Sequence, residues 1–269
     1  MKDTNDNCPF AAHGIDHLSA SSINLFIEDP ARWVMRYLFV APKQQKPVFW
    51  RGTAVDDDIG RMFGMKENQK EPVAAEDCKT LAMEQYFGLA TYWQEQGYEF
   101  DAEEVGKESA NLTKYLDSAL PFYEKLGKPS AYQKEINLML DDCPVPINGF
   151  IDLMYGEGDD AVVRDIKTTG RKPLLRPSVA RQLAIYAQAE TATPIVDYVY
   201  VTSRTSEVIT FDVDNWELHL DDVRRAVKAM TNLVSYSNDA TQIASLIYPD
   251  YDKWSWSAEE IHFAKSIWR

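Results

Sequence analysis

Residues 161–170 read AVVRDIKTTG, an apolar run that ends in charged and hydroxyl side chains. The run predicts a strand, in which successive side chains point to opposite faces. Asp165 and Lys167 should therefore share one face, while Ile166 points into the core. A carboxylate and an ammonium in one cavity suit phosphodiester hydrolysis at a metal ion, but an isolated D-x-K triplet more often ends a surface strand. The rest of the sequence has to decide between these meanings.

The composition is that of an ordinary globular protein. Of its 269 residues, 45% are hydrophobic and 26% are charged, which is enough to build a substantial core. No apolar run approaches the roughly 20 residues that cross a bilayer, and the first residues lack the apolar segment of a secretory signal. We therefore expect no membrane contact and a cytoplasmic location. The cysteines Cys8, Cys78 and Cys143 are far apart, and the four histidines lack metal-binding spacings, which argues against disulfides, zinc and an iron–sulfur cluster.

The net charge of −14 argues against a protein coated in nucleic-acid-binding surface, because clustered Lys and Arg normally neutralise phosphates. The basic residues are nevertheless concentrated around the D-x-K triplet. Between positions 164 and 181, six positive side chains accompany the single acid Asp165: Arg164, Lys167, Arg171, Lys172, Arg176 and Arg181. A local basic patch is therefore expected beside the candidate site.

The first half of the chain predicts an N-terminal arm followed by helices. Residues 1–17 are polar and irregular and indicate a flexible arm. Residues 18–127 indicate a helical region that packs on the core. Its helices are expected after the caps Ser19 and Asp29, over Ala75–Gln96 and over Ala102–Leu126.

Three consecutive acids, Asp56, Asp57 and Asp58, follow the segment at residues 52–55, which reads GTAV. They are either a metal-binding cluster or the solvated first turn of a helix, where negative charge suits the positive end of the helix dipole. The helix start is the commoner meaning of such a group. One of the three acids can still face the site.

After Gly127 the apolar period changes from that of helices to that of strands. Residues 128–269 predict a core that ends in a helix and an aromatic tail, and together with the helical region this core makes one integrated domain. The expected order is an antiparallel meander over Gln133–Leu140, Ile147–Tyr155 and Ala161–Lys167, a helix over Val179–Ala192, strands over Val196–Thr202 and Glu207–Phe211, and a helix over Trp216–Ser235.

Polar residues fall at regular places along this order. Gln182 and Tyr186 are four apart and so share one face of the helix that follows the meander. The set consists of Glu135 in the first strand, Asp152 after Gly149 in the second, Asp165 and Lys167 at the end of the third, and Gln182 and Tyr186. Each spacing is common by itself, but the ordered set is much rarer.

With these residues the chain resembles the PD-(D/E)XK nuclease superfamily and, within it, the RecB-like exonuclease family. The similarity rests on residues 149–152, 164–168 and 182–187, and on the earlier segments 18–30 and 52–55. The resemblance implies an α/β (α+β) fold, with a restriction-endonuclease-like αβββαβ core, a mixed central sheet and an additional N-terminal helical region.

The resemblance also implies roles for individual residues. Asp152, Asp165 and the main-chain carbonyl of Ile166 would hold Mg²⁺ or Mn²⁺, and Lys167 would be the catalytic lysine. Gln182 and Tyr186 would support the site and the substrate. Glu135 matches a less regular acidic position of the family, with an exposed surface acid as the equally weighted alternative.

Two departures from the family pattern bear on the metal. RecB-like nucleases usually have a His a few residues after the Gly-Thr motif, where this chain has Asp56. An acid there could replace the metal ligand, tune the choice of metal or mark weakened activity. The tail also lacks the cysteines of relatives that carry an iron–sulfur cluster, so aromatic packing should hold that end.

The function implied is that of an Mg²⁺/Mn²⁺-dependent deoxyribonuclease, an exonuclease acting on DNA ends or single strands in recombination, repair or phage DNA metabolism. A compact nuclease of this kind is compatible with a recombination partner protein. The alternative is a catalytically weakened, nuclease-like DNA-binding or accessory subunit. The expected DNA-binding residues are Arg51, Arg171, Lys172, Arg176 and Arg181.

Overall fold

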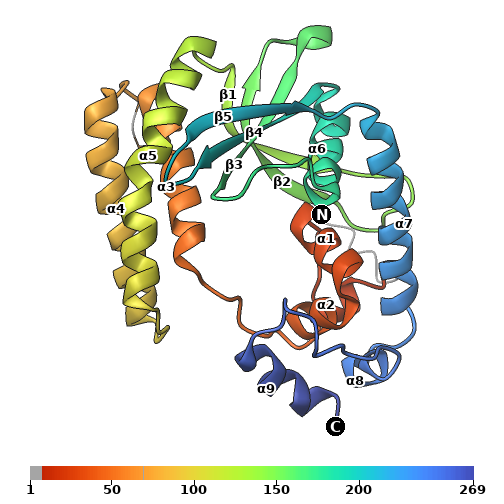
Figure 1. Cartoon of the computed structure of the whole chain (residues 1–269). Coiled ribbons are helices and arrows are strands. Elements are labelled where there is room, and N and C mark those ends of the chain that lie inside the picture. The colour runs from red at the N-terminus through yellow and green to blue at the C-terminus, as the bar shows by residue number, and fades with distance from the viewer. Residues whose placement is uncertain (1–7, 69) are drawn as a thin grey trace.

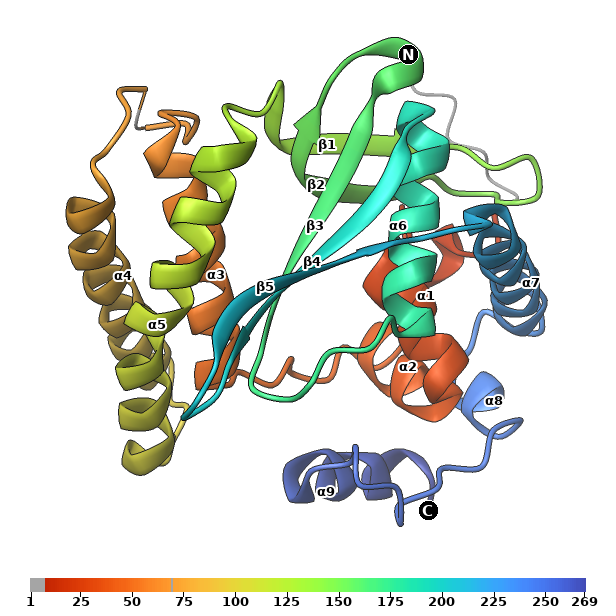
Figure 2. The same cartoon turned by 45° about the horizontal axis from the view of Figure 1, so that its top comes forward.

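A mixed five-stranded sheet runs through the centre of the computed structural model, which describes residues 8–68 and 70–269 (Figures 1 and 2). The strands lie side by side in chain order: β1 (Ala131–Leu138), β2 (Ile147–Tyr155), β3 (Val162–Thr169), β4 (Thr193–Val201) and β5 (Ser206–Asp212). Only β3 and β4 are parallel, because helix α6 (Pro177–Glu190) crosses over between them. The predicted meander, the mixed sheet and the fold class are confirmed.

Two layers of helices enclose the sheet (Figure 2). Helices α3 (Pro47–Met62), α4 (Ala75–Glu95) and α5 (Ala102–Leu126) form one layer, and α6, α1 (Ala20–Glu28) and α7 (Trp216–Val234) form the other. The remaining helices, α2 (Pro30–Tyr37), α8 (Ala240–Ala244) and α9 (Ala258–Ile267), lie together beyond α1. None of the helices in the described ranges combines the length and the apolar character that crossing a membrane requires.

Each face of the sheet therefore packs against its own hydrophobic core. Val163 of β3 belongs to the core beneath α6, whereas Ile166 belongs to the core beneath α3–α5. Asp165 and Lys167 share the alternation of Val163, so their side chains leave β3 on the α6 side. This arrangement confirms the predicted directions of the D-x-K side chains.

The predicted helix starts are confirmed at the two capping side chains Ser19 and Asp29 but not at the acids of residues 56–58. Ser19 accepts a hydrogen bond from the Ser22 N–H (3.2 Å), and Asp29 accepts one from the Arg32 N–H (3.3 Å), as expected for the caps of α1 and α2. Helix α3, however, begins at Pro47, in the first position that proline favours. The acids at residues 56–58 thus lie well inside α3, and the prediction that they start a helix is wrong.

The prediction of a flexible arm over residues 1–17 is wrong for the part that the structure describes. Phe10 and Ile15 are buried in the core beneath α6. The N–H of Leu18 donates to the carbonyl of Pro146 (2.9 Å), which fixes the segment beside the start of β2. Two isolated apolar residues in a polar stretch gave no periodic signal, although both are core residues. Residues 1–7 lie outside the described residues.

The C-terminal tail packs against α2. Trp256 is buried beside Ala31 and Met35, and its indole N–H donates to Oδ2 of Asp29 (2.9 Å). Arg32 adds an ion pair to Glu260 of α9 (2.8 Å). Aromatic packing therefore does hold this end, as the missing cysteines implied.

A buried ion pair braces the sheet on the α5 side. Arg164 of β3 lies 2.9 and 2.7 Å from the two carboxylate oxygens of Asp197 in β4. Asp197 is fully buried and also accepts hydrogen bonds from Tyr123 of α5 (3.1 Å) and Thr210 of β5 (2.6 Å). The carboxylate is thus compensated from three elements, β3, α5 and β5. Arg164 is committed to this network and takes no part in the expected basic patch.

Replacing Asp197 by Ala should lower the free energy of unfolding by about 3–5 kcal/mol, because Arg164 would stay buried without its counter-charge. Urea unfolding followed by circular dichroism measures the loss. Asp222→Ala is the matched control, since its pair with Arg225 on α7 is exposed and should contribute less than about 1 kcal/mol. Equal losses in the two variants would contradict the assignment.

Candidate active site

The sheet forks between β2 and β3, and the fork builds the site. Backbone pairing between β2 and β3 ends at the pair Leu153–Arg164 and does not extend to Asp152. There the carboxylate of Asp152 accepts the hydrogen bond of the Ile166 N–H (2.8 Å). A side chain thus replaces the strand carbonyl that an unbroken ladder would supply, and Asp152 is held next to Asp165.

Asp165 is almost completely buried at this fork. The ammonium of Lys167 lies 2.8 and 2.7 Å from its two carboxylate oxygens. From α6, the amide of Gln182 donates to Oδ1 of Asp165 (2.9 Å) and to the hydroxyl of Tyr186 (3.0 Å). The structure therefore brings together the residues of the D-x-K and Q-x-x-x-Y patterns, as the sequence predicted.

Gly149 lets α6 approach the site closely. A Cβ atom at this position would lie 3.1 Å from a ring carbon of Tyr186, which is tighter than ordinary van der Waals contact. The glycine that precedes Asp152 in the G-x-x-D pattern thus makes room for the tyrosine that follows Gln182.

Asp56 reaches the same site from α3. Its Oδ2 accepts hydrogen bonds from the hydroxyl of Tyr132 (3.1 Å) and from the amide of Gln133 (2.8 Å), both in β1. The amide of Gln133 also donates to Oδ1 of Asp152 (3.2 Å). Tyr132 and Gln133 were missed from the sequence. No local signal could have found them, because their contacts depend on the β1–β2 register, in which the pairs Tyr132–Leu153 and Lys134–Ile151 flank Gln133 and Asp152.

The two other acids of α3 have partners elsewhere. Asp57 pairs with Lys66 and accepts hydrogen bonds from Gln85 and, more weakly than Asp56 does, from the hydroxyl of Tyr132 (3.3 Å), and Asp58 pairs with Arg61. Of the alternatives that the sequence left open for this triplet, the structure selects the one in which a single acid faces the site.

Of the acids at the site, Asp165 is paired with Lys167, whereas Asp56 and Asp152 accept hydrogen bonds from neutral donors. Burial, with Asp165 nearby, raises the pKa of Asp152 to about 7. Burial and the charge of Asp152 also raise the pKa of Asp56 well above its ordinary value. Burial alone would lower the pKa of Lys167, but Asp165 and Asp152 outweigh it and raise that pKa, so Lys167 stays protonated.

These groups fit a hard divalent cation. Oδ1 of Asp56 is buried and has no hydrogen-bond partner within residues 8–68 and 70–269. Over the same ranges, no three His, Cys, Asp or Glu side chains form a ready-made group that could hold a metal. Mg²⁺, however, is commonly held by one or two carboxylates together with water and substrate phosphates. Asp152 and Asp165 supply such a pair, and the role of the Ile166 carbonyl stays a prediction.

Three predicted residues lie elsewhere. Glu135 is exposed on β1, in register with Phe150, and the structure does not bring it to the site. Arg51 is buried, where it pairs with Glu108 and donates to Oγ1 of Thr168 (3.2 Å). Arg181 is buried as well and donates to Asn24 (2.7 Å). These contacts correct the prediction that both arginines contact DNA phosphates. A buried guanidinium with a fixed partner cannot also bind a phosphate in solution.

The expected DNA-binding side chains that remain are exposed. Arg171, Lys172 and Arg176 lie in the loop between β3 and α6. The hydroxyl of Thr169, at the end of β3, accepts the N–H of Arg171 (3.1 Å) and so fixes the start of this loop.

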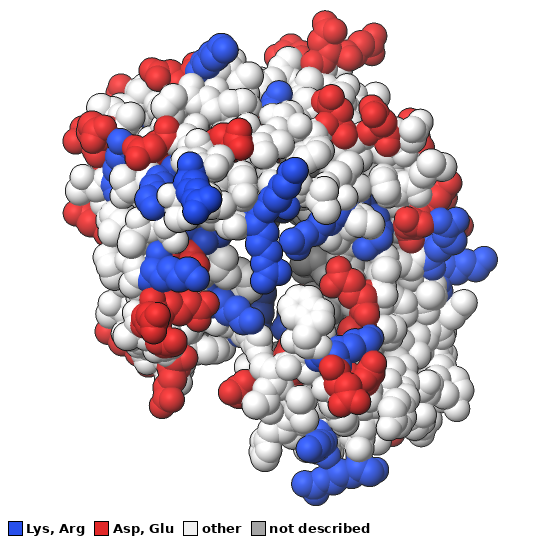
Figure 3. All heavy atoms as spheres, in the orientation of Figure 1, with Lys and Arg blue, Asp and Glu red and all other residues white. Residues whose placement is uncertain are grey.

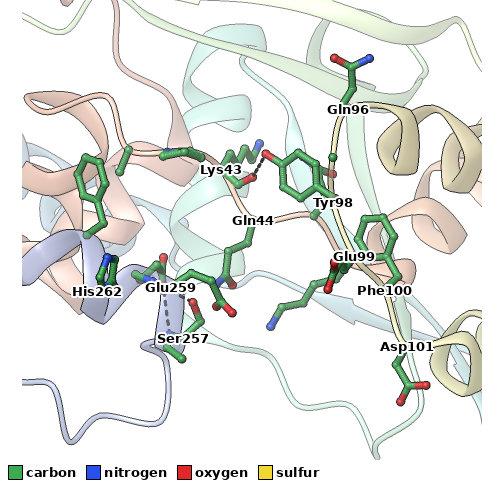
Figure 4. Close-up of a pocket in the computed structure, with 18 of the residues that line it drawn as sticks. Lys43, Gln44, Gln96, Tyr98, Glu99, Phe100, Asp101, Ser257, Glu259 and His262 are labelled. Atoms are coloured by element: carbon green, nitrogen blue, oxygen red, sulfur yellow. Dashed lines mark hydrogen bonds between the residues drawn. The ribbon is translucent and has the colours of Figure 1, made fainter.

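A cavity of about 1130 Å³ lies apart from the carboxylates (Figure 4). Residues 41–47, the α4–α5 turn and the start of α9 line it, and the hydroxyl of Tyr98 donates to the carbonyl of Lys43 across it (3.2 Å). Its charged side chains are mixed, with Lys43 and Lys46 beside Glu99 and Glu259. Such a lining does not favour a phosphate, so we place the chemistry at the fork of the sheet.

The fold and the site together define a class of protein. Two aspartates on diverging strands, a lysine two residues beyond the second, and a helix that crosses to a parallel strand are the features of a nuclease of the restriction-endonuclease-like fold. The family model of the PD-(D/E)XK nuclease superfamily matches residues 17–245. The chain belongs to this superfamily, whose members generally use divalent metals such as Mg²⁺.

One solved structure agrees on the fold. A crystal structure of a candidate exonuclease from Eubacterium rectale is 11% identical in sequence, with a TM-score of 0.53 over 97% of this chain and 92% of that chain. The structure of SSO0001 is 17% identical and covers 75% of this chain and 94% of that chain, but its TM-score of 0.35 is too low to bear on the fold. No curated protein matches the chain at a significant level.

The raised pKa values predict that metal binding depends on pH. A cation needs ionised carboxylates, and the pKa of Asp152 is about 7 in the metal-free site. Mg²⁺ affinity should therefore be highest above pH 7. Below pH 7 it should fall by about tenfold per pH unit for each proton that binding releases. Isothermal titration calorimetry in two buffers of different ionisation enthalpy measures both the affinity and the proton release. An affinity that is constant between pH 6 and 8 would contradict the assignment.

Proposed function

We propose that this protein is an Mg²⁺- or Mn²⁺-dependent DNA exonuclease that hydrolyses phosphodiester bonds in DNA recombination, repair or phage DNA metabolism. The observation that carries the proposal is the convergence of Asp152, Asp165 and Lys167 at one fork of the sheet, within a chain of the PD-(D/E)XK superfamily. The likeness to a candidate exonuclease supports the finer assignment.

The residues of the fork divide the work. Asp152 and Asp165 would hold the cation, which when bound neutralises the scissile phosphate and polarises a water molecule. Lys167 is held protonated beside Asp165, so it acts as a donor that orients the water and stabilises developing negative charge, and not as a base. Gln182 positions Asp165, because its amide fixes one carboxylate oxygen.

The substrate path follows the loop between β3 and α6. This loop leaves β3 two residues after Lys167 and presents Arg171, Lys172 and Arg176 to solvent. Figure 3 shows Lys and Arg side chains gathered around the hollow at the centre of one face, although the whole chain carries a net charge of −14. A local positive surface on an acidic protein favours DNA binding at this place only.

Asp165→Asn and Lys167→Ala should each reduce cleavage of linear DNA by at least about a hundredfold, because each removes a charge that stabilises the transition state. Gel assays of end-labelled linear DNA, run beside closed circular DNA with Mg²⁺, Mn²⁺ or chelator, measure this loss. Cleavage should need the cation and spare the circle.

Asp159→Asn is the matched control, since Asp159 is an exposed acid in the turn before β3. This variant should cleave DNA as the parent does. Parent-like cleavage by the Asp165 and Lys167 variants would refute the proposal. Metal or DNA binding without any turnover in the parent would favour the accessory subunit instead.

Arg171→Ala should weaken DNA binding and lower the slope of log affinity against log salt concentration by about 1, since one phosphate contact is lost. Fluorescence anisotropy of labelled DNA in chelator, at several salt concentrations, measures this slope. Arg225→Ala on α7 is the control, because Arg225 is equally exposed but lies on another helix. The same slope in both variants would show that the loop does not contact DNA.

A further inference from the structure

Gln133 adopts a backbone conformation that is unusual for a residue inside a strand. Its φ is +48°, in the left-handed region that favours glycine. Consecutive strand residues normally point to opposite faces, yet Tyr132 and Gln133 both reach Asp56. A non-glycine residue keeps such a conformation when its surroundings hold it there, and positions of this kind cluster at functional sites.

The side chain of Gln133 stands between two carboxylates. Its Nε2 lies 2.8 Å from Oδ2 of Asp56 and 3.2 Å from Oδ1 of Asp152. An amide nitrogen carries two hydrogens, so one group can satisfy both acids. The bridge is neutral, however, and does not cancel the repulsion between the acids. It also leaves Oδ1 of Asp56 buried without a hydrogen-bond partner among the residues that the structure describes.

The surrounding packing keeps this bridge in place. A Cβ atom at Gly60 of α3 would lie 2.5 Å from the ring of Tyr132, so the glycine lets the ring lie flat against the helix. The hydroxyl of the same tyrosine donates to Asp56 (3.1 Å). Asp56 and Gln133 are thus held by a rigid contact between α3 and β1, and they cannot drift apart without disturbing it.

We propose that Asp56, Gln133 and Asp152 form a binding site for a divalent cation, Mg²⁺ or Mn²⁺, in which Gln133 contributes its side-chain oxygen and Asp152 is shared with the pair that it makes with Asp165. The inference rests on the proposed metal-dependent function and adds a ligand that the D-x-K pattern does not contain. A half-turn about the last bond of the side chain exchanges the amide nitrogen for the carbonyl oxygen. The amide group that bridges the two acids in the absence of metal then supplies an oxygen ligand when a cation binds.

The donor set suits such a cation. Three oxygens, two of them from carboxylates, match the preference of Mg²⁺ and Mn²⁺ for oxygen ligands. The site also fits the finding that, among the described residues, no three His, Cys, Asp or Glu side chains gather as a metal group, because one of its ligands is an amide.

Isothermal titration of the full chain with Mn²⁺ and with Mg²⁺ tests the site through two substitutions of opposite sign. Gln133→Ala should weaken binding about tenfold, since it removes a ligand and the bridge that positions the other two. Gln133→Glu should tighten binding about tenfold, because it keeps an oxygen and adds a charge. In chelator the same glutamate should lower the unfolding temperature, because three acids then repel one another.

Gln85→Ala is the matched control. Gln85 also donates a hydrogen bond to an acid of α3, but that acid is Asp57. The side-chain oxygen of Gln85 accepts a hydrogen bond from Arg61. This variant should bind the cations as the parent does. Circular dichroism and cooperative unfolding confirm that each variant is folded, and Gln133→Glu keeps the test open if the alanine variant does not fold.

Parent-like binding by Gln133→Ala, or weaker binding by Gln133→Glu, would overturn the inference and leave Gln133 as a structural bridge. The outcome is separable from that of the proposed function. Metal binding that weakens in Gln133→Ala, in a parent that cleaves no DNA, would support this site and refute the nuclease. Metal-dependent cleavage by the parent, with unchanged cation affinity in Gln133→Ala, would support the nuclease and overturn this site.

Discussion

The hydrogen bond from the Ile166 N–H to the carboxylate of Asp152 is the contact on which the site depends. A sheet that continued to pair past Leu153 and Arg164 would satisfy this N–H with a strand carbonyl and would leave no opening for acidic side chains. Because a side chain takes over the bond, the strands can diverge without leaving a buried donor unpaired. The fork then receives Asp56 from the α3 layer and Gln182 from the α6 layer, so residues from both helical layers meet at one point.

Much of this arrangement could be predicted from the sequence because the signals are local. The alternation around Asp165 and Lys167 and the spacing of Gln182 and Tyr186 depend only on the geometry of one strand or one helix. Gln133 was out of reach, since its contacts depend on the register of β1 against β2 and on a left-handed residue that no composition indicates. Glu135, which matches a less regular acidic position of the family, lies on the surface.

The charged residues show where sequence reasoning ends. Arg164 and Arg181 belong to the basic patch that the sequence predicts, and Arg51 to the expected DNA-binding residues, but each is paired inside the fold by a group from a distant segment. The partners are Asp197, Asn24 and Glu108, respectively. Whether an arginine faces solvent or a buried partner depends on which distant segment packs against it. The residues next to the arginine in the sequence do not identify that segment.

Asp29 has a consequence for the order of events during synthesis. Its carboxylate caps α2 at once, but its second oxygen receives the indole of Trp256, which follows 227 residues later along the chain. The apolar surface that Ala31 and Met35 offer to this indole therefore stays uncovered until residue 256 has been synthesised. A nascent chain that has not yet reached residue 256 carries all the residues of the fork but leaves this apolar surface uncovered, and exposed apolar surface of this kind is prone to aggregate.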